Sequence, residues 1–176
     1  MDHAYLGEAT DVVLGQEFLT WLWYRSESQA GRFKTDAGEP FALFMEQRVS
    51  VTGGEGDAKE TTSVSGLLSE LREAKTGLAM GKKVSKALVR IEADAEQWSA
   101  TLKAEDMSLS SFKTPKVDTG REEGEDPDAA FLEKMYLLER GLAFLDSVFL
   151  EFLALRFSPG WKEEAAAAGR WMAQDA

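Results

Sequence analysis

One stretch, residues 126–157, constrains the fold of this chain more than any other. Its large apolar residues recur at alternating spacings of four and three positions, which is typical of one face of an α-helix. They are Phe131, Met135, Leu138, Leu142, Leu145, Phe149 and Phe152. Asp126 and Pro127 favour a helix start, and the Ser-Pro-Gly at 158–160 favours a helix end. The pattern predicts one unbroken helix about 45 Å long, at roughly 1.5 Å per residue.

A second apolar strip lies beside this seam, formed by Leu137, Phe144, Val148 and Leu155. The combined apolar surface is broad, so more than one neighbour must cover it. We therefore expect the helix to be a spine that the rest of the chain packs against, or one that packs in part against a second copy. The residues that we expect at the contact between two copies are Phe149, Phe152 and Leu153.

A tryptophan-rich segment, residues 11–27, predicts a second helix, with Asp11 as its cap. The segment is apolar nearly all round, which indicates burial on two sides. Its aromatic residues Trp21, Trp23 and Tyr24 allow two interpretations. They could form a platform on which single-stranded bases stack, or they could pack in the core. Flanking leucines favour the core, because stacking platforms usually lie on sheets between basic residues.

The middle of the chain alternates between apolar and polar residues, which is typical of half-buried strands. Residues 41–52 predict a strand that returns through residues 61–65 as a hairpin, and residues 66–75 predict a short helix ended by Gly77. Further strands are predicted within residues 87–91, 98–104 and 107–113, and a closing helix within residues 161–172. The fold class is therefore α+β, with an antiparallel meander of five strands packed against the tryptophan-rich N-terminal helix and the long C-terminal helix.

Length and composition predict one domain over residues 1–176, because 176 residues with 44% hydrophobic content can bury a substantial core. Residues 114–128 are charged and carry glycine and proline, so we expect a flexible acidic surface loop there. The net charge of −11 argues against a nucleic-acid-binding protein with a generally basic surface. It is compatible with a local basic patch.

The sequence does not contain the residues that several kinds of catalytic and metal sites require. The chain has no cysteine, so disulfides, thiol nucleophiles and cysteine metal sites are excluded. Its single histidine, His3, lies close to the terminus, which argues against a catalytic histidine. The glycines near residue 54 lack the ending of a phosphate-binding loop. We therefore predict a protein that is not an enzyme and holds no metal or cofactor. Without a secretory signal or an apolar run near the ~20 residues of a membrane span, a cytoplasmic location is expected.

The basic residues concentrate in one region of this acidic chain: Lys75, Lys82, Lys83, Lys86 and Arg90, which Lys113 and Lys116 could join from later strands. On a strand, Lys86 and Arg90 point to the same side. Such a patch could contact DNA phosphates without reading bases. The other interpretation is a solvated sheet face whose charges pair with Glu92 and its neighbours.

The order of these segments resembles the C-terminal half of the bacterial recombination-associated protein RdgC family. The matching pieces are a tryptophan-rich helix at 14–27, a basic turn with its strand at 71–94, a strand-rich piece at 99–116 and the long helix at 131–153. Together they span most of residues 11–155.

This resemblance implies double-stranded DNA binding without sequence preference, modulation of RecA-type recombination, and a dimer. It implies that the DNA backbone is contacted by Lys82, Lys83, Lys86 and Arg90. Lys113 and Lys116, from the later strands, are further candidates. A nucleoid-associated place in the cytoplasm would follow. The chain differs from the family in its acidity and in lacking the N-terminal half that builds a ring. The alternative is an acidic protein-interaction or oligomerisation module without nucleic-acid binding.

Overall fold

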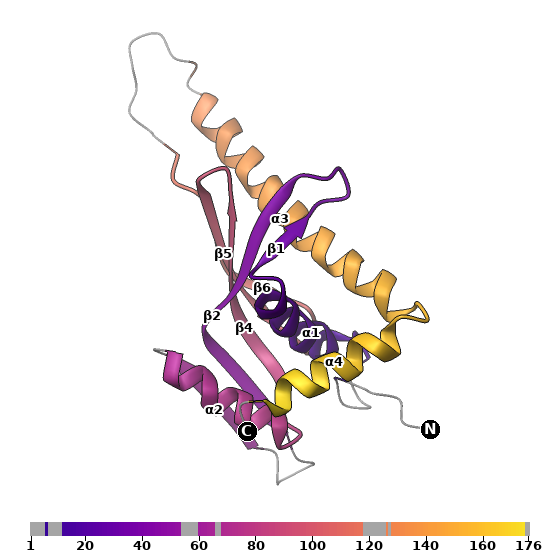
Figure 1. The fold of residues 1–176 in the computed structure, drawn as a ribbon. Helices are drawn as coiled ribbons and strands as arrows, with labels where there is room; N and C mark the ends of the chain where they lie inside the picture. Colours follow the sequence, from indigo (N-terminus) through magenta and orange to yellow (C-terminus); the bar gives the residue numbers. More distant parts are fainter. Residues whose placement is uncertain are drawn as a thin grey trace.

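A computed structural model describes residue 6 and residues 12–53, 60–65, 68–117, 126 and 128–174, without the side chains of residues 47–49, 60–65 and 68–71. The described chain is an α+β fold: an open antiparallel sheet with a layer of helices against it (Figure 1). The predicted fold class is confirmed. The predictions for His3, Asp11, Pro127 and most of the acidic loop concern positions outside the described residues.

Among the described residues the sheet has six strands, one more than predicted. In chain order they are β1 Arg32–Lys34, β2 Pro40–Gly53, β3 Glu60–Ser65, β4 Lys83–Ala93, β5 Glu96–Lys103 and β6 Leu109–Lys113. The spatial order is β1-β2-β4-β5-β6, and β3 also pairs with β2. Because β1 pairs with residues 40–42 and β3 with residues 48–53, the two short strands lie along the same long strand. Strand β1 was missed, since three residues are too few to show alternation.

Four helices complete the fold in the described part of the chain: α1 Gly15–Ser28, α2 Leu68–Ala79, α3 Ala129–Arg156 and α4 Trp161–Ala173. The long helix and the closing helix are confirmed at nearly the predicted bounds. The prediction that Gly77 ends α2 was wrong. Gly77 lies inside the helix, where a Cβ would come within 2.9 Å of a methyl group of Val51, so this glycine serves close packing. No helix within the described residues has both the length and the apolar character needed to cross a membrane.

Alternation divides the sheet residues between two faces. In β4, the side chains of Ala87, Val89 and Ile91 are buried, and those between them are more exposed. Residues paired across antiparallel strands share a face, so Leu43, Ile91 and Trp98 form one buried row. This face receives the helices: Phe144 of α3 packs on Phe41, with ring centroids 4.7 Å apart.

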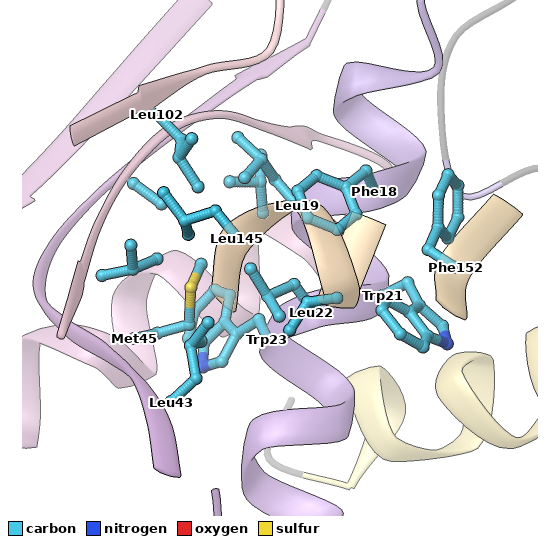
Figure 2. Close-up of a cluster of buried hydrophobic side chains, with 14 of the residues drawn as sticks. Phe18, Leu19, Trp21, Leu22, Trp23, Leu43, Met45, Leu102, Leu145 and Phe152 are labelled. Carbon is cyan, nitrogen blue, oxygen red and sulfur yellow. The ribbon is translucent and has the colours of Figure 1, made fainter. Parts of the chain in front are cut away.

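The core lies between this face and α1, which runs against β2 and β4 (Figure 2). The side chains of Trp21 and Trp23 are 0% and 1% exposed, so the core-packing interpretation of the tryptophan-rich segment is confirmed. Phe18 contacts both Phe149 and Phe152 of α3, with centroids 5.0 and 5.4 Å apart. Burying such large aromatic groups is a main source of stability, because each removes a large apolar area from water.

The spine helix α3 is covered along only part of its surface. Its buried residues are Leu137, Gly141, Phe144, Leu145, Val148 and Phe152. Phe152 is fully buried in this chain's own core, and Phe149 and Leu153 are partly buried against it. The residues predicted for the contact between two copies therefore pack largely within one chain. At the start of the helix, Asp126 accepts a hydrogen bond from the backbone N–H of Asp128, at 2.9 Å.

Candidate functional site

The second face of the sheet is the candidate site, because the helix contacts described above fall on the other face. Its rows follow from the strand register: Phe44 pairs with Arg90, Arg90 with Ser99, and Ser99 with Lys113. A second row joins Ser50, Lys86 and Lys103. We call the surface formed by these rows and by the outward residues of β1 the uncovered face.

Basic side chains outnumber acidic ones on the uncovered face, as far as its side chains are described. The basic residues are Arg32, Lys34, Lys86, Arg90, Lys103 and Lys113, and the acidic residues are Glu46 and Glu92. In a chain with a net charge of −11, this distribution separates the charges in space. A locally positive surface attracts polyanions even when the whole protein is acidic.

Arg90 occupies the middle of the uncovered face and is held there by carboxylates. Its guanidinium donates to Glu46 and pairs with Glu92, and it lies 4.8 Å above the ring of Phe44. The ring in turn packs against Gly31, where a Cβ would lie 2.4 Å from a ring carbon. The charge-pairing interpretation is therefore confirmed for Arg90, whose positive charge is largely balanced by its neighbours.

Lys86 and Lys103 lie directly opposite each other on β4 and β5, and both are exposed. Cβ atoms of such pairs are roughly 5 Å apart, and like charges at that separation repel. Within the described part of the chain, neither ammonium group has an ion-pair partner within 4.0 Å, although Lys103 attracts the exposed carboxylate of Asp106 in the turn that follows β5. An anion placed between the two lysines would relieve their repulsion, so this pair is the strongest anion-attracting feature of the uncovered face.

The other predicted basic residues are distributed over different surfaces. The stem of Lys82 lies beside Gly53 and Gly77. Lys83 begins β4 opposite Thr52, on the same side of the sheet as Ser50 and Lys86 but beyond the two rows. Lys116 lines a groove with Phe131 and Lys134 at the start of α3. Of the six predicted contact residues, Lys86, Arg90 and Lys113 thus lie in the two rows of the uncovered face, and Lys83 lies on the same side of the sheet at its end.

Lys103 was missed by sequence reasoning. The alternation of Trp98, Ala100 and Leu102 already placed Lys103 on the outward side of its strand. What the sequence did not provide was the register that sets it opposite Lys86.

Carboxylates near the Asp94–Ala95 turn are engaged by Arg140 of α3. Its guanidinium donates to Glu39, to Asp94 at 2.6 Å and to Glu96 at 2.6 Å. The hydrogen bond with Glu39 raises the pKa of Arg140 above its ordinary value, and partial burial opposes this effect. Among the described residues, no group of three or more histidine, aspartate or glutamate side chains could hold a metal ion.

Comparisons with known proteins identify no match: no family model, no curated protein and no solved structure is similar to this chain. The resemblance to the RdgC family stays a prediction.

Proposed function

We propose that this protein binds double-stranded DNA through its phosphate backbone, on the uncovered face of the sheet and without reading base sequence. The observation that carries the proposal is the exposed pair Lys86 and Lys103, with Lys113 on the neighbouring strand. Lysine ammonium groups bind phosphates as point charges. The resemblance to the RdgC family points the same way and adds recombination of the RecA type as the setting.

The chemistry of the face favours backbone contact over base readout. Direct readout needs side chains that enter a groove and pair with base edges, usually from a helix or a two-stranded ribbon. The uncovered face instead offers lysines and the hydroxyl groups of Ser99 and Ser110 on adjacent strands. Such groups position a protein on DNA without carrying sequence information.

Arg90 has a smaller role in this proposal than the sequence suggested. Glu46 and Glu92 already balance its charge, so its loss removes little net attraction for phosphate. Removing it also leaves those two carboxylates unpaired on the face, which weakens DNA binding by repulsion. The effect of Arg90→Ala on DNA binding therefore measures the charge balance of the face. The effect of Lys86→Ala measures the loss of a direct phosphate contact.

The direct test is fluorescence anisotropy of labelled 30-base-pair duplexes of two unrelated sequences, titrated with the full chain at low salt. The proposal predicts saturable binding with equal affinity for the two sequences. Unlabelled polyphosphate should compete, because the contacts are electrostatic. Absence of binding at about 20 mM salt, where phosphate contacts are strongest, would contradict the proposal.

A further inference from the structure

The side of α3 that faces away from the sheet carries two rows of exposed apolar side chains. One ridge along it is formed by Phe131, Met135 and Leu142, and another by Leu132, Tyr136 and Leu150. The side chains of Phe131, Leu132 and Tyr136 are each at least 60% exposed. Apolar residues concentrated on both sides of one helix are typical of a helix that contacts two partners.

The helix geometry shows that this surface is opposite to the core. With 3.6 residues per turn, Leu132 and Leu150 point about 160° away from the fully buried Val148, and Tyr136 points about 120° away from it. In Figure 1 the first turns of α3 also extend past the end of the strands. The intramolecular core therefore leaves this surface, which we call the outer face of α3, without cover from the described helices and strands.

A line of carboxylates separates the two apolar ridges. Asp128, Glu139 and Asp146 are exposed, and their spacing of eleven and seven residues places them on one line along the helix. In the described part of the chain, Glu139 and Asp146 form no ion pair. A ligand for the outer face must therefore combine apolar groups with positive charge between them.

This charge pattern discriminates between possible occupants. A second copy of the chain would bring the same acidic line, and a two-fold contact between two outer faces would set carboxylates against carboxylates. An anionic membrane surface would be repelled for the same reason. A helix with leucine-like residues at helical spacing and lysines or arginines between them matches both the ridges and the line.

We propose that the outer face of α3 is a docking surface for a basic amphipathic helix of a partner protein. The partner's apolar side chains pack along the two ridges, and its cations pair with Glu139 and Asp146. This site is separate from the uncovered face of the sheet, and its occupation does not depend on DNA binding.

The test uses a fluorescein-labelled 18-residue helical peptide with leucines on one face and lysines beside them, titrated with the full chain. A peptide of the same pattern with glutamate in place of lysine is the second probe. The proposal predicts saturable binding of the lysine peptide alone. Glu139→Lys/Asp146→Lys should weaken that binding by about tenfold or more.

A matched control separates docking from general attraction to an acidic protein. Glu73→Lys/Glu105→Lys makes the same change in net charge at two exposed sites, one on α2 and one in the turn between β5 and β6, and should leave the affinity within about twofold. Equal weakening by both double variants, or equal binding of the two peptides, would overturn the proposal. So would a dimer in sedimentation that Leu132→Ser/Tyr136→Ser converts to a monomer, because a second copy would then occupy the outer face.

Discussion

The indole Nε1 of Trp98 donates a hydrogen bond to the backbone carbonyl oxygen of Leu137, at 2.8 Å. This contact joins the centre of the sheet to the spine helix in a buried setting, where an unpaired indole N–H would be costly. The approach is possible because Gly141 stands next to the indole. A Cβ on Gly141 would lie 2.5 Å from Cδ1 of Trp98. The glycine thus sets how closely α3 approaches the sheet.

Gly141→Ala should destabilise the protein by about 1–3 kcal/mol, because the added methyl group forces α3 away from Trp98. The matched control is Gly169→Ala in α4, where a Cβ meets nothing within 4 Å. That change should stabilise the protein by about 0.5–1 kcal/mol through helix propensity. Urea unfolding followed by circular dichroism measures both. Equal effects of the two substitutions would show that Gly141 does not control the packing of α3.

Ala95→Gly should leave stability unchanged or raise it by up to about 1 kcal/mol. Asp94 and Ala95 form the two-residue turn between β4 and β5 with φ angles of 48° and 65°, a left-handed conformation that glycine adopts without strain. Ala143→Gly, at an exposed position of α3 with ordinary helical geometry, should instead cost about 1 kcal/mol. Thermal unfolding of the two variants gives the comparison. A loss of stability in Ala95→Gly equal to that in Ala143→Gly would contradict the strain argument.

Arg156→Met should destabilise the protein by about 3–5 kcal/mol, because it leaves the carboxylate of Glu17 buried without its arginine partner. Glu17 is 1% exposed, accepts from Arg156 Nε at 2.6 Å and also accepts from the backbone N–H of Leu6. Adding Glu17→Gln to Arg156→Met should recover part of the loss, since the buried negative charge is then gone. A double-mutant cycle by urea unfolding checks this coupling, and additive losses would speak against it.

Arg140→Lys should cost about 1–2 kcal/mol, although it keeps the charge. Lysine has no planar guanidinium to bridge Glu39, Asp94 and Glu96 or to lie over Trp98, as Arg140 does at 5.6 Å. The pKa of Arg140 is raised in the folded protein, so the charged guanidinium stabilises the fold fully at any pH below the ordinary arginine pKa. This stabilisation is lost only as the pH rises through the pKa that Arg140 has in the folded protein. The difference between wild type and variant should therefore be the same at pH 7 and pH 9. A difference that disappears at pH 9 would contradict this assignment.

Elements with a long, unbroken period were predictable from sequence. The seam of α3 and the alternation of β2 and β4 each extend over enough residues to identify the element, and the resulting α+β class was confirmed. Strand β1 was not predictable, because its three residues are specified by pairing with Phe41 and its neighbours. Periodicity predicted the apolar faces of α3, but it did not predict which part of them the sheet covers. Phe152 accordingly lies in the core, and Phe131 lies outside it.

The candidate site was only partly predictable, for a related reason. Lys86, Arg90 and Lys113 were found from sequence because alternation places Lys86 and Arg90 on one side of a strand. The partners across the strands depend on register, which the sequence did not reveal. Register sets Lys103 opposite Lys86, and it brings Glu46 close enough to balance Arg90. Lys116 follows the end of β6 and lines the groove beside the start of α3, so strand alternation does not place it on the face.

The salt dependence of duplex binding tests the proposed DNA contact most directly. The variant Lys86→Ala/Lys103→Ala/Lys113→Ala should bind a 30-base-pair duplex more weakly, with a slope of log K against log salt smaller by roughly 3. The control Lys134→Ala/Lys162→Ala/Arg170→Ala removes the same charge from the helical side of the molecule and should leave the slope unchanged. If both triple variants keep the slope of the wild type, or lose it equally, the uncovered face of the sheet is not the site of DNA contact.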